Sequence, residues 1–141
     1  MIVKDVMNRN VMATKPDTSV REAAEIMTKH KIGSLIILEG EKIAGIITET
    51  NVLHAVAEKK DPDATAVSDV MAKDVVTIDP GKKIEDAVEL MLKYQIKRLP
   101  VIDNEKLVGV VTASDVIAVE PKLIEAVASL ISVKIPGYQG G

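Results

Sequence analysis

The chain repeats itself at a fixed offset of 64 residues. Residues 5–53 align with residues 69–117 without a gap; 16 of the 49 aligned positions are identical, and many of the others exchange one aliphatic residue for another. Similarity of this kind indicates two copies of one supersecondary unit. Because a unit of about 55 residues with one small sheet is marginally stable alone, we expect the two copies to share one small body with a pseudo-twofold axis.

Each copy predicts the same order of elements. A short extended segment, Val11–Thr14 or Val75–Ile78, ends at a proline and precedes an amphipathic helix. Ser19 with Glu22 has the spacing of a capping box at the start of the first of these helices. The apolar positions recur at i, i+3, i+4 and i+7, as a helix with one buried face requires. They are Val20, Ala23, Ala24 and Met27 in the first copy, and Ile84, Ala87, Val88 and Met91 in the second.

Two short apolar runs follow each of these helices and predict paired strands. The runs are rich in aliphatic residues, and the turn sequences EGEK and DNEK separate them, which is typical of a hairpin. A second helix is expected to begin at Thr48 or Thr112. The predicted strands are Leu35–Leu38 and Ile43–Ile47 in the first copy, and Leu99–Ile102 and Leu107–Val111 in the second.

The predicted fold is therefore of the mixed α/β (α+β) class, with two βαββα-type repeats whose sheets pack together. We expect repeat 1 at residues 1–60, a polar, proline-bearing linker at 61–68 and repeat 2 at 69–118. Residues 119–141 then supply a C-terminal helix and a flexible, glycine-rich tail. The helix is predicted from the spacing of Leu123, Ile124, Val127, Leu130 and Ile131.

Composition excludes several classes of function. The net charge of −3 and the presence of only two aromatic residues argue against nucleic-acid binding, which favours clustered cations and stacking platforms. The absence of cysteine excludes disulfides, thiolate catalysis and cysteine-based zinc sites. No apolar run approaches the ~18 residues of a membrane span, and the start lacks the apolar stretch of a secretory signal. We therefore expect a cytoplasmic protein that is not bound to a membrane.

No catalytic or metal-binding set is found in the sequence. His30 and His54 lie 24 residues apart on different predicted helices, and neither belongs to a nucleophile–base pattern. We therefore predict no catalytic residues, no metal site and no required cofactor. Gly45 and Gly109, each inside a predicted strand, indicate either a bulge or a close approach of other atoms. In a ligand-binding module such glycines would leave room for a base.

The repeat resembles the cystathionine β-synthase (CBS) domain, in the tandem arrangement called a Bateman module. The resemblance rests on DVM at each start, the EA/DA helix, IGSLIIL with IKRLPVI, and GIITETNV with GVVTASDV, and it covers about residues 1–118. It implies clefts between paired repeats that bind AMP, ATP or S-adenosyl compounds. It also implies regulation of an attached or partner protein, and frequent assembly into homodimers.

The stronger candidate site lies in the second copy, at the helix start Thr112-Ala113-Ser114-Asp115. A carboxylate there can accept hydrogen bonds from both hydroxyls of a ribose, although T-x-x-D is also an ordinary helix cap. Lys97 and Arg98 precede a buried strand and suit phosphates, or they are simply a solvated pair. The resemblance favours the ligand in both cases. The residues it assigns to this site are Ile78, Lys97, Arg98, Pro100, Thr112, Ser114 and Asp115.

The first copy predicts a weaker site. Gly33 and Ser34 replace the cations, and Asn51 replaces the acid while Thr48 persists. An amide still forms hydrogen bonds, but without charge. We expect this site to be weak, empty or suited to a less charged adenosine compound. Its candidate residues are Thr14, Ser34, Ile36, Thr48 and Asn51.

A regulatory module that senses an adenosine-containing ligand is the leading hypothesis. Its expected partners are that small molecule, a second copy of the chain, and a regulated protein of unknown identity. A ligand-independent scaffold for dimerisation or interaction is the alternative, and Gly33, Ser34 and Asn51 favour it for the first copy. A free-standing enzyme and a DNA-binding protein rank third and fourth.

Overall fold

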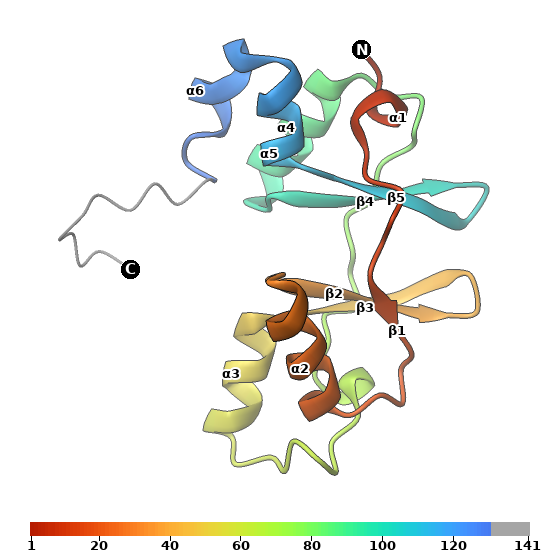
Figure 1. The fold of residues 1–141 in the computed structure, drawn as a ribbon, viewed down its shortest axis with the longest axis vertical. Coiled ribbons are helices and arrows are strands. Elements are labelled where there is room, and N and C mark those ends of the chain that lie inside the picture. The colour runs from red at the N-terminus through yellow and green to blue at the C-terminus, as the bar shows by residue number, and fades with distance from the viewer. Residues whose placement is uncertain (131–141) are drawn as a thin grey trace, which may run out of the picture. The chain divides into compact units, whose positions relative to one another are not determined.

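The computed structural model describes residues 1–130 and contains six α-helices and two small sheets (Figure 1). This mixture of helices and strands confirms the predicted fold class. The chain divides into two compact units. The first-repeat unit is Asn10–Val75 with Asn104–Leu107. The second-repeat unit is Met1–Arg9, Val76–Asp103 and the chain from Val108 onward.

The first-repeat unit places two helices beside a three-stranded sheet in the order β1-β2-β3. Strand β1 is parallel to β2, and β2 is antiparallel to β3. The predicted hairpin is confirmed, with Gly40 in the left-handed region at its turn. The helices bury Ala23 and Met27 against the sheet residues Leu35, Ile37 and Ile47. The elements are β1 (Ala13–Thr14), α2 (Val20–His30), β2 (Ser34–Glu39), β3 (Lys42–Thr48), α3 (Glu49–Ala57) and the 3₁₀ helix η1 (Val67–Asp69).

The second-repeat unit has the same plan with more helix. Strands β4 and β5 pair in a two-stranded sheet; Asn104 and Glu105 at the turn between them, which is grouped with the first-repeat unit, both have positive φ. Met91, Leu99, Val101, Val111 and Val116 form the centre of its core. The elements are α1 (Val3–Val6), α4 (Ile84–Tyr94), β4 (Arg98–Asp103), β5 (Lys106–Thr112), α5 (Ala113–Val119), η2 (Pro121–Leu123) and α6 (Ile124–Val127).

The extended segment predicted at Val75–Ile78 forms only an isolated bridge. Ile78 bridges to Val101, and its N–H donates to the carbonyl of Pro100 at 3.0 Å. The equivalent of Pro100 in the first copy is Ile36, which pairs with Ala13 in the β1–β2 ladder. Because proline has no N–H, it cannot donate to a third strand. The prediction of a third strand was therefore wrong for the second copy.

Each unit is completed by the segment that opens the other sequence repeat. In the second-repeat unit, the Val3 N–H donates to the Lys82 carbonyl at 2.8 Å. At the positions 64 residues later, the Val67 N–H donates to the Thr18 carbonyl at 2.8 Å. Val3 and Val67 are both fully buried. The short segments that lead into the two DVM motifs therefore dock one on each unit.

The docked segments explain why glycine occurs at positions 45 and 109 within the strands. A Cβ on Gly45 would lie 2.6 Å from the Ala72 carbonyl oxygen, and one on Gly109 would lie 2.7 Å from the Met7 sulfur. The close approach predicted at both glycines is confirmed. The space beside them is taken by the chain itself, so the suggestion that they leave room for a base was wrong.

The segment predicted as a linker, 61–68, packs on the start of α2. The carbonyls of Pro62 and Thr65 accept hydrogen bonds from the N–H groups of Arg21 and Val20. Arg21 also pairs with Asp63. The hydrogen bond to Asp63 and the negative charge of that carboxylate raise the pKa of the Arg21 guanidinium. The side chain of Ser19 accepts from the Glu22 N–H at 3.1 Å, which is the first half of the predicted capping box; the reciprocal bond to the Ser19 N–H is not formed among the described residues. Here the linker contributes to the fold of the first-repeat unit.

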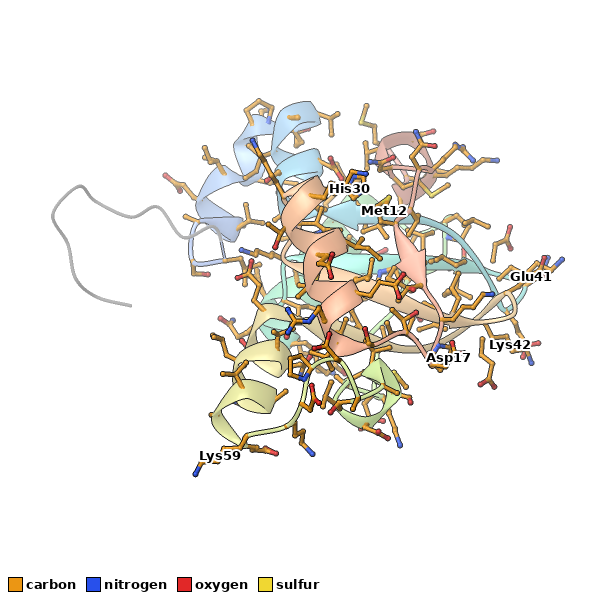
Figure 2. All side chains as sticks on the ribbon, turned by 60° about the horizontal axis from the view of Figure 1, so that its bottom comes forward. Met12, Asp17, His30, Glu41, Lys42 and Lys59 are labelled. Atoms are coloured by element: carbon orange, nitrogen blue, oxygen red, sulfur yellow. The ribbon has the colours of Figure 1, made fainter. Side chains whose placement is uncertain are left out.

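Two exposed ion pairs lie at the tip of the β2–β3 hairpin, where Figure 2 shows Glu41 and Lys42. Glu41 pairs with Lys106 at 3.2 Å, and Lys42 pairs with Glu105 at 3.7 Å. The C-terminal helix is short, and Ile124 is 53% exposed, which departs from the predicted apolar stripe. Ile131 and the glycine-rich tail lie outside the described residues.

Candidate functional site

The second-repeat candidate residues gather where β5 passes into α5. Thr112 is the N-cap of α5, and its Oγ1 accepts from the Asp115 N–H at 3.1 Å. One carboxylate oxygen of Asp115, Oδ2, accepts from the Thr112 N–H at 3.0 Å. The helix-cap interpretation of T-x-x-D is therefore confirmed. It uses one oxygen of the carboxylate and leaves Oδ1 without a hydrogen bond in the described chain.

The start of β4 lies beside this helix cap. The Ala113 N–H donates to the Lys97 carbonyl at 2.9 Å, which ties the residue before β4 to the first residue of α5. Arg98 is half-buried, whereas Lys97 is exposed. Neither side chain forms an ion pair or a hydrogen bond within residues 1–130. The structure thus brings a half-buried, uncompensated guanidinium and a free carboxylate oxygen to neighbouring elements.

Apolar groups border the same strand. Ile78 and Pro100 are buried, and their backbones are joined by the hydrogen bond described above. Ser114 is exposed in the first turn of α5. All seven second-repeat candidates therefore lie on β4 or directly before it, on the segment bridged to it, or at the β5–α5 junction of one unit.

The first-repeat unit reproduces this junction with different chemistry. Thr48 caps α3, and the Glu49 N–H donates to the Gly33 carbonyl at 3.2 Å. Ser34 pairs directly with Thr48 across the β2–β3 ladder, and Ile36 is buried on the same strand. On the edge strand β1, the hydroxyl of Thr14 lies 2.6 Å from the hydroxyl of Thr18, which follows the strand. No cation replaces Lys97 or Arg98 here.

The two copies differ in hydrogen-bond polarity at the fourth position of the motif. The Oδ1 atom of Asn51 accepts from the Thr48 N–H at 2.8 Å and from the Thr48 hydroxyl at 3.0 Å. A backbone N–H can only donate, so the atom facing it is the amide oxygen. The NH₂ of Asn51 is left without a partner among the described residues. The first copy therefore offers donors where the second copy offers a carboxylate oxygen.

A family model for the CBS domain matches the chain twice, at residues 3–58 and 67–122. The chain belongs to the CBS-domain family. Its two CBS repeats therefore correspond to the two copies found in the sequence, and the resemblance deduced from the motifs is confirmed. Pairs of CBS domains are regulatory modules.

Relatives and solved structures agree with this assignment. The CBS domain-containing protein YhcV of Bacillus subtilis is 36% identical over 114 residues, which cover 80% of this chain and 81% of that protein. A protein of Methanopyrus kandleri, MK0525, is 38% identical over 128 residues, which cover 89% of this chain and 65% of that protein. The inosine-5'-monophosphate dehydrogenase of Korarchaeum cryptofilum is 36% identical over 77% of this chain, a match to only 22% of the enzyme.

One structural neighbour was solved with ligands of the class that the resemblance implies. The CBS domain pair of protein MJ0100 was solved with 5'-methylthioadenosine and S-adenosyl-L-methionine. It is 29% identical with a TM-score of 0.76, over 86% of this chain and 97% of that chain. CBS pairs similar to this chain thus bind adenosine-containing molecules.

Residues 1–130 contain no group of three or more histidine, aspartate or glutamate side chains placed to hold a metal ion. None of the helices in this part of the chain is both long and apolar enough to cross a membrane. His30 and His54 are exposed, and Figure 2 shows His30 on α2.

Sequence reasoning missed the difference in polarity between Asn51 and Asp115. Asparagine was expected only to lack charge. Which amide atom faces Thr48 depends on the geometry of the cap, although the T-x-x-N spacing was a usable signal because such caps use the side-chain oxygen.

Proposed function

We propose that this chain is a regulatory module whose second CBS repeat binds an adenosine-containing ligand. The observation that carries the proposal is the divided role of the Asp115 carboxylate. One oxygen holds the start of α5 and the other is free to accept a hydroxyl hydrogen bond. A charge-assisted bond of this kind contributes about 1.5–3 kcal/mol, so a ribose is well suited to it.

The neighbouring residues fit the rest of such a ligand. Arg98 and Lys97 supply two cations without carboxylate partners, which suits the phosphates of AMP or ATP. Buried Ile78 and Pro100 supply an apolar wall for the base, and Ser114 adds a hydroxyl near the ribose. The ligands of the MJ0100 pair support the S-adenosyl class as an alternative to nucleotides.

The first-repeat residues are proposed to form a second, weaker site. Thr14, Ser34, Ile36, Thr48 and Asn51 offer no cation and no free carboxylate. The NH₂ of Asn51 can donate to a ligand oxygen, but it cannot accept from a ribose hydroxyl. We therefore assign this site to a less charged adenosine compound, or to none.

The module has no catalytic role of its own in this proposal, and it requires no cofactor. Ligand binding alters output only if two states of the protein bind the ligand differently. The output is the activity of a partner protein or the assembly of a homodimer, and the working compartment is the cytoplasm.

A thermal-unfolding screen tests the proposal. The ligands are AMP, ADP, ATP, S-adenosylmethionine, methylthioadenosine and NAD, each with the wild-type chain and with Asp115→Asn. A ligand at ~100 times its Kd adds about 2.7 kcal/mol, or about 5–10 °C for a chain of this size. Asp115→Asn is the matched variant, because an asparagine at the equivalent position of the first copy keeps the cap through its amide oxygen. We expect a shift for at least one ligand with wild type and its loss in the variant.

The scaffold alternative predicts a different result. Gly33, Ser34 and Asn51 show that one copy already lacks the charged groups, and a pure interaction protein would not require them in the other. If no compound at millimolar concentration shifts the unfolding temperature, the sensor proposal fails and the scaffold takes its place.

A further inference from the structure

The last part of the described chain packs onto the helices of the second-repeat unit. Residues 121–130, which we name the cover segment, contain η2 and α6, two helices of only three and four residues. The helix η2 contacts α5, and α6 contacts α4 (Figure 1). Val127 is fully buried and Leu130 is 9% exposed, and both belong to the core of this unit, against which Leu123 also packs. These three apolar side chains hold the segment in place.

Few other interactions attach the cover segment. Within residues 1–130, its side chains form no hydrogen bond and no ion pair. Its backbone hydrogen bonds are local, such as those from the Leu123 N–H to the Glu120 carbonyl at 3.0 Å and from the Leu130 N–H to the Val127 carbonyl at 2.9 Å. Helices this short are not stable by themselves. A segment held by so few buried groups opens at a lower free energy than the whole unit unfolds.

The cover segment begins where α5 ends. Glu120 is both the C-cap of α5 and the N-cap of η2, and its N–H donates to the Val116 carbonyl at 2.9 Å. The opposite end of α5 is the cap formed by Thr112 and Asp115. Since α5 has seven residues, about 10 Å of helix separates the candidate ligand site from the cover segment.

The buried face of α5 depends on the cover segment. Ala113, the first residue of α5, is 2% exposed and belongs to the same core cluster as the buried side chains of the cover segment. Its counterpart on α3, Glu49, is exposed. Val116 is fully buried, whereas its counterpart Val52 is half-buried. In the first repeat, the segment that follows α3 packs on the start of α2 instead. The comparison indicates how much of α5 the cover segment buries.

We propose that docking of the cover segment is coupled to ligand binding at Asp115, so that the segment responds to occupation of the second-repeat site. The inference rests on the proposed function, because it concerns the regulation of that same site. When the cover segment undocks, α5 loses packing over its buried face, and a helix of seven residues does not persist without such packing. The Asp115 carboxylate then loses its fixed position. Because coupling is reciprocal, a ligand that needs this carboxylate favours the docked segment by the same factor.

Amide hydrogen exchange of the full chain, followed by mass spectrometry, tests the coupling. The probes are AMP and S-adenosylmethionine, each present at about 100 times the Kd that calorimetric titration gives for it. If the undocked state does not bind the probe, saturation slows exchange in residues 121–130 and in α5 by up to about a hundredfold. We expect this protection with whichever probe binds the second repeat.

The variants Val127→Asp and Ile124→Asp separate docking from charge. Both place one carboxylate on α6, but Val127 is fully buried and Ile124 is 53% exposed. We expect Val127→Asp to undock the segment and weaken probe binding about tenfold or more, and Ile124→Asp to bind as wild type does. Val127→Ala is a milder change that keeps the fold. It should speed exchange of the Asp115 N–H, which donates to the Thr112 hydroxyl oxygen, even without a probe.

The outcomes distinguish this inference from the proposed function. If a probe binds but exchange in residues 121–130 is unchanged, the coupling is wrong and the proposed function stands. Equal affinity of Val127→Asp and Ile124→Asp also overturns the coupling, as does unchanged exchange of α5 in Val127→Ala. If neither probe binds the wild-type chain, the proposed function fails for both ligands and the coupling fails with it.

Discussion

Adding one methyl group at Gly45 should destabilise the protein more than the same change at Gly109. The Cβ of Gly45→Ala would lie 2.6 Å from the backbone carbonyl oxygen of Ala72 and 2.6 Å from the sulfur of Met71. The Met71 side chain can rotate, but the carbonyl can move only with its segment. That segment is held by two hydrogen bonds between Ile46 and Ala72, each of 2.9 Å.

The expected loss of unfolding free energy depends on whether the new methyl group is accommodated by overpacking or by a shift of the docked segment. Overpacking of a well-packed site costs about 1–3 kcal/mol. If the segment shifts instead, two hydrogen bonds worth about 0.5–1.5 kcal/mol each are lost. Either route gives about 1–3 kcal/mol for Gly45→Ala, and the contact with a backbone carbonyl favours the upper part of that range. At Gly109 the sulfur of Met7 is at 2.7 Å and the Asn8 carbonyl oxygen at 3.0 Å. Since most of that contact is with a flexible side chain, we expect about 1 kcal/mol.

Urea unfolding followed by circular dichroism measures both changes. Gly33→Ala is the control, because the nearest atom to its Cβ is a carboxylate oxygen of Glu49 at 3.4 Å, an ordinary contact. Its stability should equal or slightly exceed that of wild type. A loss below 0.5 kcal/mol in Gly45→Ala, or a larger loss in Gly109→Ala, would refute the assignment of these glycines to the docked segments.

Two further predictions concern the ends of helices and the choice of ligand. Lys31 and Gln95 follow α2 and α4 with φ of 53° in the left-handed region, so Lys31→Gly and Gln95→Gly should each raise stability by about 0.5–1 kcal/mol. A lower unfolding temperature for either variant in calorimetry would contradict this. Arg98→Ala should weaken binding of AMP or ATP about tenfold and leave uncharged methylthioadenosine unaffected. Equal weakening of both ligands in calorimetric titration would show that Arg98 does not meet a phosphate.

The elements of the fold could be predicted because each rests on local patterns that occur twice. The stripe from Val20 to Met27, the hairpin turn at Gly40 and the helix starts at Thr48 and Thr112 are fixed by short-range chemistry. The docking of Val3 and Val67 could not be predicted, because so short a segment does not specify which part of the chain it contacts. Pro100 did contain a signal, since its missing N–H limits pairing beside β4.

The candidate site was predictable in composition and less so in chemistry. Thr112 with Asp115 and Lys97 with Arg98 were identified as sequence motifs. That one carboxylate oxygen of Asp115 is used in the helix cap while the other stays free could be seen only from the geometry of the cap. The reversal of polarity at Asn51 follows from the same geometry, because the backbone N–H of Thr48 selects the amide oxygen.

Calorimetric titration of the reciprocal pair Asp115→Asn and Asn51→Asp, with the ligand that gives the largest thermal shift, tests the central claim most directly. We predict that Asp115→Asn loses the tight binding, by about ten- to a hundredfold. Asn51→Asp should keep it and strengthen any second, weaker binding event. Tight binding that survives Asp115→Asn would contradict the account, because the ligand would then not depend on the free carboxylate oxygen of the second repeat.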